Sequence, residues 1–513
     1  MSALFRGGHA DFGDVMSAQQ PVISDTVPRS ARKVDWLGLF IVILSVALSA
    51  LIAVAVDQLG LIAILVVPAA LMFLGAIGKP ELGLAGLLII TYTQLSNVGI
   101  VHFGLPSIAQ PLAGLLIVVI LIRIAVYGER PLGWVRAGLF LLIYTVSWLI
   151  SLLHADDSLA ANIAFIGFAK DALGMLIVVY FIQHHGSLRR AVWALIAAGL
   201  FMGTISAFQY LTSDFNNIYW GFGGWEQQVS GAVERHRLTG PYSNPNAYAQ
   251  ILVVLAPIAL DRIWHERNIW LRVLAAWALT AIVLTIFFTF SRGGFLSLVF
   301  GVAILLTQRR FNFVPVIMTF VVGLGLIQFL PASYSDRINS LFQLVPSEND
   351  QVVDTSFRGR LSENTAAMRM FQDNPIFGVG LGNYRTNYQD YSRNLGLDHR
   401  REPRSPASLY LELLAEQGIV GIMIFAALMI YVFLGLLRAR SHFVLAGLRD
   451  EAYITAAIFA GLAAYMFEAI FKNSAYSNVF WILVGVALAA IQVAQTSFDA
   501  ASVGKDSVLR QKV

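Results

Sequence analysis

Long apolar runs dominate the chain and constrain its fold more than any other feature. Hydrophobic residues make up 57% of the 513 residues and charged residues only 13%, so the polar surface is too small to cover a soluble globule of this length. Most runs are close to the roughly 20 residues that cross a bilayer as a helix, and they lack the roughly ten-residue alternation of a membrane β-barrel. The sequence therefore predicts an all-α integral membrane protein, a polytopic bundle of about 14 transmembrane helices with a range of roughly 12 to 14.

The apolar runs also indicate where these spans lie. We expect spans at 36–56, 59–77, 82–100, 111–126, 137–153, 163–183, 191–211, 247–260, 269–290, 295–306, 313–329, 419–437, 453–471 and 479–493. Several of them are short, so neighbouring runs can merge or re-enter the membrane.

Lysine and arginine in the short loops predict the orientation. Pairs such as Arg189–Arg190 and Arg309–Arg310 fall on one side, which the positive-inside rule makes cytoplasmic. Residues 1–34 lack the features of a secretory signal and are expected to be a cytoplasmic tail. The predicted organisation is then a bundle over 35–330 with an outward loop at 212–246, a large, mostly helical outward cap over 331–407, C-terminal helices over 408–496 and a cytoplasmic tail over 497–513.

The outward loops contain arginines, against the positive-inside trend. They are Arg235, Arg237, Arg292, Arg358 and Arg360. A guanidinium group offers a planar fork of donors that matches phosphate oxygens, so several converging arginines suit a diphosphate headgroup. The alternative is that each one snorkels to lipid phosphates or forms a local salt bridge.

The segment TGPYSNPNAYAQ predicts a turn followed by the start of a helix, with Asn244 as the capping residue. The cap is one interpretation. The other places Tyr242, Asn244 and Asn246 at the rim of a headgroup pocket, where a helix N-terminus favours an anion. Lys170 and Asp171 interrupt a span and are expected to pair inside the bundle, although Lys170 can reach a phosphate if it faces an outward cavity.

The segment SLYLELLAEQG places Glu412 and Glu416 on one face of a helix that starts near Ser408 and can continue into the span at 419. Carboxylates at this depth are costly unless they are paired, so we expect at least one to meet an outward arginine. Glu416 is expected to form a structural ion pair, and Glu412 is a candidate proton acceptor.

A second predicted cap helix, 360–373, is expected to stop at Asn374-Pro375, just before GVGLGNY. These glycines resemble a dinucleotide fingerprint, but no βαβ unit surrounds them. Gly378, Gly380 and Gly382 are instead expected to form a tight turn that packs the cap against the bundle, with Asn383 in a supporting role.

The sequence shows no pattern that is typical of a metal or cofactor site. The chain has no cysteine, and its histidines show no metal-ligand spacing. We therefore predict no metal, no other cofactor and no nucleic-acid partner.

Together, RLTGPYSNPN, RGRL, NPIFGVGLGNY and SPASLYLELLAEQG resemble the bacterial O-antigen ligase and O-antigen polymerase family over roughly 237–421. The resemblance implies a metal-independent glycosyltransferase at the periplasmic face of the inner membrane. Its donor would be a glycan linked to undecaprenyl diphosphate, and its acceptor another glycan or lipid A core, with membrane lipids and other polysaccharide assembly proteins as partners. Arg360 would act on the leaving diphosphate. The larger span count favours a polymerase over a ligase. A flippase or transporter is a second alternative, but the matched broken helices expected of it are not seen.

One position departs from the family pattern. Ala407 stands where the family has histidine, inside an otherwise matching motif. One interpretation is natural divergence, with Glu412 or His399 taking over proton transfer. The other is a targeted replacement of a natural histidine, which predicts near inactivity and recovery by about a hundredfold or more in Ala407→His.

Overall fold

A computed structural model describes residues 75, 78–129, 133–230, 233–308, 355–397, 404–474 and 477–510. The expected spans at 36–56, 59–77 and 313–329, the tail 1–34 and much of the cap loop lie wholly or largely outside these residues. The described part belongs to one compact unit, which begins at Ile52.

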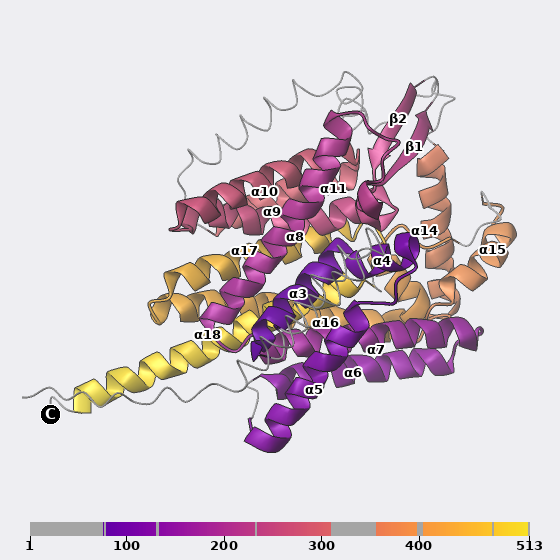
Figure 1. Ribbon diagram of the computed structural model, residues 1–513. Coiled ribbons are helices and arrows are strands. Elements are labelled where there is room, and N and C mark those ends of the chain that lie inside the picture. The colour runs from indigo at the N-terminus through magenta and orange to yellow at the C-terminus, as the bar shows by residue number, and fades with distance from the viewer. Residues whose placement is uncertain are drawn as a thin grey trace, which may run out of the picture. The chain divides into compact units, whose positions relative to one another are not determined.

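Helices make up nearly all of the described secondary structure (Figure 1). In the first half they are α3 (Pro80–Thr93), α4 (Leu95–Phe103), α5 (Ala109–Tyr127), α6 (Trp134–Leu153), α7 (Ser158–Phe181), α8 (His185–Leu211), α9 (Pro245–His265), α10 (Ile269–Phe288) and α11 (Arg292–Thr307). The second half contributes α14 (Thr355–Asp373), α15 (Tyr384–Asn394), α16 (Leu409–Leu445), α17 (Arg449–Glu468) and α18 (Asn478–Arg510).

The long apolar helices confirm a polytopic membrane fold. Eight described helices are long and apolar enough to cross a membrane, or nine if the bent pair α3 and α4 forms one span. Each expected span within the described residues coincides with a helix, or with the α3–α4 pair, which bends by 59° at Gln94. The positive φ of 55° at Gln94 ends α3 there. The total of about 14 spans stays a prediction.

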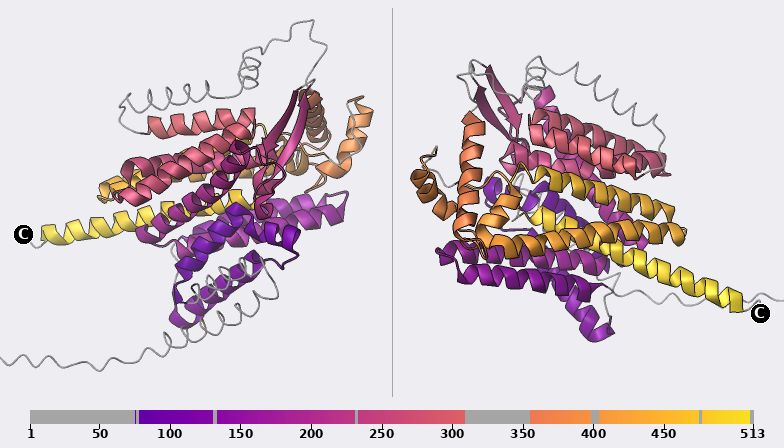
Figure 2. Two further views of the ribbon diagram at one scale, coloured as in Figure 1. Left: turned by 45° about the horizontal axis from the view of Figure 1, so that its top comes forward. Right: turned by 180° about the vertical axis from the view of Figure 1, so that it is seen from behind.

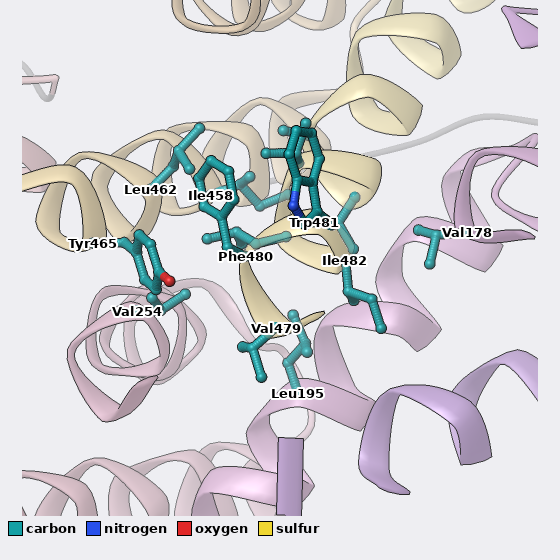
Figure 3. Packing of buried hydrophobic residues seen from close by; sticks show 14 of the residues in the cluster. Val178, Leu195, Val254, Ile458, Leu462, Tyr465, Val479, Phe480, Trp481 and Ile482 are labelled. Atoms are coloured by element: carbon teal, nitrogen blue, oxygen red, sulfur yellow. The ribbon is translucent and has the colours of Figure 1, made fainter. Parts of the chain in front are cut away.

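The bundle core is formed by close packing of α17 and α18 against α7, α8 and α9. Figure 3 shows Phe480 and Trp481 of α18 beside Tyr465 of α17, with Val254 and Leu195 below them. Phe480 stacks on Tyr465 at 5.2 Å between ring centroids. Aromatic rings bury large apolar areas, so this contact stabilises the packing of α17 against α18.

One end of the described unit carries α14, α15 and a β-hairpin, which lie together in Figures 1 and 2. The hairpin pairs β1 (Trp225–Ser230) with β2 (Val233–Leu238), antiparallel and with Glu226 opposite Arg237. The hairpin was not expected, so the predicted all-α fold is correct for the bundle but misses this sheet. The dipeptide Ser230-Gly231 was the available signal, because it favours a turn.

The predicted local signals around the cap hold. Helix α14 stops at Asp373, directly before Asn374-Pro375, and Asn244 caps α9 by accepting from the N–H groups of Asn246 and Ala247 at 3.0 Å each. Helix α16 begins after Ser408 and continues through the predicted span. These stops and caps bring the GVGLGNY turn and the first turns of α9 and α16 to the same end of the bundle.

Candidate functional site

A cavity of about 520 Å³ opens at the end of the bundle that carries α14 and α15. Its walls come from α7, from the turn η2 (Gly240–Tyr242) with α9, from α15, from α16 and from the α17–α18 loop. The lining residues are Ala160, Ile163, Ala164, Tyr242, Ala247, Gln250, Ile251, Gly382, Tyr384, Arg385, Ser405, Glu412, Glu416, Lys472, Asn473, Ser474 and Ser477.

The lining of this cavity combines groups of different polarity. Small apolar residues of α7, among them Ala160 and Ala164, line part of it. The cations Arg385 and Lys472 and the carboxylate of Glu412 line it as well. A ligand that fits this lining combines an apolar part with an anionic or strongly polar part.

Glu416 holds the glycine-rich turn in place. Its carboxylate, 2% exposed, accepts hydrogen bonds from the N–H groups of Gly382 at 3.0 Å and Tyr384 at 3.2 Å. The charge of Arg385 also acts on this carboxylate, and the expected ion pair of Glu416 stays a prediction. Glu416 thereby fixes the start of α15, the helix that brings Arg385 to the cavity.

Close backbone contacts explain the glycines of this turn. Gly378, Gly380 and Gly382 have φ of 71°, 100° and 69°, a region that side chains disfavour. A Cβ atom at Gly378 would collide with the backbone of Glu416, and one at Gly380 with the backbone of Ala155. The turn therefore packs directly on α16 and on the α6–α7 connection.

Helix α16 is interrupted where the segment that begins this turn packs against it. At Gly418, φ is 63° and ψ is −160°, so the helix is interrupted there. The N–H of Ile419 donates to the carbonyl of Pro375 at 2.9 Å, and the N–H of Val379 donates to the carbonyl of Ala415 at 2.8 Å. These bonds satisfy backbone groups that the break leaves unpaired within the helix.

Asn383 joins the turn to α7. Its side-chain oxygen accepts from the N–H of Asp157 at 2.6 Å, and its amide donates to the carbonyl of Asp157 at 3.1 Å. Asp157 is the N-cap of α7, the helix that supplies the apolar wall. Asn383 thus fixes the glycine-rich turn to the start of α7.

Glu412 lies against the loop between α17 and α18. Its carboxylate, 4% exposed, accepts from the side-chain amide of Asn473 at 3.3 Å, and the Lys472 ammonium donates to the oxygen of the same amide. Burial lowers the pKa of Lys472, and Glu412 counteracts this by raising it. A carboxylate and an ammonium therefore face one cavity through a shared amide.

The segment around position 407 lies between α14 and the cavity. Arg404 forms an ion pair with Glu363 at 3.5 Å, and Arg385 Nε donates to Ser405 Oγ at 2.7 Å. The N–H of Ala407 donates to Asn364 Oδ1 of α14 at 3.2 Å. Ser405 lines the cavity, whereas Ala407 does not.

Arg237 is engaged by neighbouring protein groups. The residue is buried, and its guanidinium donates to the carbonyl of Thr289 at 2.9 Å, to Glu226 at 3.0 Å and to Asn246 Oδ1 at 3.0 Å. It ties the hairpin to the end of α10 and the start of α9, and it does not line the cavity. Its predicted contact with a diphosphate stays a prediction.

Arg360 acts electrostatically on a second buried carboxylate, Glu468, which accepts from Ser297 Oγ at 2.8 Å. Gly293, next to Arg292 on α11, leaves room for this carboxylate. The field of Arg360 reaches both Glu468 and Lys472, and it contributes to the lowered pKa of Lys472. Arg360 therefore stands close to the cationic wall, one helical turn before Asn364 on α14.

The remaining predicted site residues contribute differently. Tyr242 lines the cavity and donates its hydroxyl proton to the carbonyl of Tyr92, while Asn244 serves as a helix cap. Lys170 is exposed on α7 and is not a lining residue. Arg358 lies in α14 without a described side chain, and His399 lies outside the described residues.

Sequence reasoning missed several lining residues, above all Arg385, Lys472 and Asn473. Gln250 and Ser474, which share a hydrogen bond of 3.0 Å, were also missed. The polar run Lys472–Asn473–Ser474 between the last two spans was an available signal, because polar residues at membrane depth are costly without a role. Within the described ranges, no group of three potential metal ligands occurs.

These features define a multi-pass membrane protein with a cavity of mixed polar and apolar lining at one end of its bundle. Residues 274–426 match the family model described as O-antigen ligase, and this match supports the O-antigen ligase and polymerase family that the motifs predicted. No curated protein matches the chain significantly. The match includes α14, α15 and the first part of α16, and therefore the turn, Arg360 and both carboxylates of α16.

Proposed function

We propose that the chain is a metal-independent glycosyltransferase that polymerises oligosaccharide repeat units linked to undecaprenyl diphosphate at the periplasmic face of the inner membrane. The family match supports a membrane glycan ligase or polymerase in general. The cavity, lined by both apolar and cationic side chains, is the observation that carries the finer proposal, because a polyprenyl diphosphate glycan has an apolar chain, an anionic linker and a polar glycan.

In this proposal the apolar wall of α7 faces the lipid, and the cations face the diphosphate. Arg385 and Lys472 line the cavity and Arg360 stands behind Lys472. Positive groups placed where charge develops in the transition state lower the barrier to departure of the diphosphate. The rim of the cavity is formed in this proposal by Arg237, Arg292, Asn244 and Asn246. Two further candidates for contact with the diphosphate are Lys170 and Arg358.

Two alternative functions differ from this one: the first uses another acceptor, and the second forms no covalent bond. A ligase would transfer the same glycan to lipid A core. A transporter would move the glycan and form no new bond. The proposed organisation keeps 1–34 and 497–513 cytoplasmic, 35–330 and 408–496 as bundle segments and 331–407 as a periplasmic cap.

The orientation can be tested directly. A reporter fused after Asp390 is expected to give a periplasmic signal, and one fused after Arg309 a cytoplasmic signal, because arginine-rich short loops stay inside. A fusion after Gly447, between α16 and α17, provides a second cytoplasmic point. The reverse pattern would place the cavity on the cytoplasmic side and contradict the proposal.

The reaction is tested with lipid-linked oligosaccharides extracted from the source bacterium, incubated with the purified full chain. We expect lipid-linked products of increasing length. Transfer to added lipid A core without lengthening would identify a ligase. Binding of undecaprenyl diphosphate to the same preparation is measured in parallel, and failure to bind would contradict both glycosyltransferase assignments.

A further inference from the structure

We infer that Glu412, Asn473 and Lys472 form an acid–base relay, in which Glu412 accepts the acceptor proton and Lys472, held by Asn473, keeps that carboxylate ionised. This inference rests on the proposed function. It assigns the proton acceptor to this chain's own residues and gives the α17–α18 loop a role outside the family match, which ends at residue 426.

The geometry begins with a shared amide. Asn473 donates through Nδ2 to Glu412 Oε1 at 3.3 Å and accepts from Lys472 Nζ through Oδ1. An amide has one donating and one accepting end, so it orients a carboxylate and an ammonium at the same time. All three residues line the cavity. The carboxylate therefore meets the space where an acceptor hydroxyl would lie.

Several groups act on Glu412 from the elements packed around it. They are Glu416 on the same helix, Tyr144 of α6, Tyr384 of α15, Tyr465 of α17 and Lys472 of the α17–α18 loop. Arg385 acts in turn on Glu416 and Lys472. Glu416 is an acid whose negative charge would oppose ionisation of Glu412, and tyrosines are neutral near pH 7. Lys472 supplies the compensating positive charge.

Two hydrogen bonds between α16 and the end of α17 keep Glu412, Asn473 and Lys472 close to one another. The N–H of Leu409, at the start of α16, donates to the carbonyl of Ala469 at 2.9 Å. Tyr410 donates its hydroxyl proton to the carbonyl of Met466 at 2.8 Å. Glu412 lies one turn after Leu409, and Lys472 follows Ala469 by three residues. The start of α16 and the end of α17 are thus fixed to each other beside the relay.

The proposed step balances without a further reactant. The acceptor hydroxyl oxygen forms a bond to the anomeric carbon of the donor, and its proton passes to the Glu412 carboxylate. The bond between the anomeric carbon and the diphosphate oxygen breaks, and the diphosphate leaves with the bonding electrons. Arg385 lies on the same wall to stabilise the departing charge. Proton release from Glu412 to solvent restores the starting state.

The relay also accounts for an alanine at position 407. Ala407 is held by its backbone against Asn364 and is outside the cavity lining, whereas Glu412 is inside it. A proton acceptor is therefore present without a histidine. Under the relay, Ala407→His is expected to change transfer by less than about threefold, well below the range for a newly supplied acid–base group.

Removal of the carboxylate is the first test. Glu412→Gln is expected to reduce transfer of extracted lipid-linked oligosaccharides by about 10²- to 10⁴-fold, the usual range for a general base. Glu412→Asp is expected to recover part of that loss. Binding of undecaprenyl diphosphate should remain within about threefold of the unaltered chain. Retention of more than one tenth of the transfer activity in Glu412→Gln, with binding intact, would overturn the relay.

The role of Lys472 is tested by the pH dependence of transfer. The reaction requires ionised Glu412, so transfer is lost as pH falls. Lys472→Met is expected to move this acidic limb upward by about one pH unit or more, because the compensating charge is gone. Lys472→Arg should leave the limb within about 0.3 units of its original position. A merely structural lysine would lower activity equally at all pH values and overturn this assignment.

These experiments distinguish failure of the relay from failure of the proposed glycosyltransferase function. An unaltered chain that does not bind undecaprenyl diphosphate contradicts the proposed function. A chain that binds it but transfers nothing, and gains a hundredfold in Ala407→His, contradicts the relay alone. Asn473→Ala should reproduce the upward pH shift in part, and an unchanged pH profile in that variant would remove Asn473 from the relay.

Discussion

Replacing Arg385 by methionine is expected to reduce glycan transfer by about a hundredfold or more, with the cap still folded. The guanidinium lines the cavity, and it donates to Ser405 at 2.7 Å in the segment that leads to α16. Methionine keeps much of the side-chain volume but removes the charge that would stabilise the leaving diphosphate. Transfer of extracted lipid-linked oligosaccharides measures the effect. Arg393→Met, an exposed arginine on the same helix, is the matched control.

The same experiment extends to α14. Arg360→Ala is expected to abolish most transfer, because its charge reaches the Lys472 side of the cavity. Arg369→Ala removes an exposed arginine of the same helix that pairs with Asp373 at 3.3 Å, and it should leave transfer within about threefold. Equal losses in Arg360→Ala and Arg369→Ala would show that any charge removal from α14 is harmful and would contradict a local role for Arg360.

Gly380→Ala is expected to prevent the cap from docking and to reduce the yield of folded protein severely. Its backbone is left-handed, with φ of 100°, and an added Cβ would collide with the backbone of Ala155. Backbone cannot move aside as a flexible side chain can, so the collision costs far more than the conformation alone. Folded yield and thermal unfolding in detergent measure the effect.

Gly396→Ala is the control for this prediction. Gly396 also has a positive φ, 62°, but nothing lies within 4 Å of the added Cβ. It therefore isolates the conformational strain, which costs about 1 to 3 kcal/mol for a residue held in such a region. Equal thermal unfolding midpoints in the two variants would show that the contact with Ala155 does not hold the turn.

Local sequence signals predicted the helices well because each depends on a few neighbouring residues. The stop of α14 at Asn374-Pro375 and the cap of α9 at Asn244 are fixed by such signals. The hairpin was missed because its strands are polar and short. In particular, β2 contains Arg237, whose partner Glu226 lies across the sheet in β1.

The candidate site was predicted only where a motif already contained its residues. Glu412, Glu416 and Gly382 belong to motifs and line the cavity. Arg385 and Lys472 also line it but lie 87 residues apart in the chain, and helix packing brings them together. Local patterns do not encode which helices become neighbours, so a wall assembled from α15 and the α17–α18 loop could not be inferred from spacing.

The break of α16 at Gly418 separates that helix into two mechanical parts. The stretch from Leu409 to Gln417 is bonded to the glycine-rich turn and to the end of α17, and the longer stretch begins with Ile419, which is bonded to Pro375 just before the same turn. Glu412 and Glu416 both lie in the first part. The segment from Pro375 to Val379 therefore bridges the interruption and acts as a splint that holds the two carboxylates at a fixed place relative to the rest of α16.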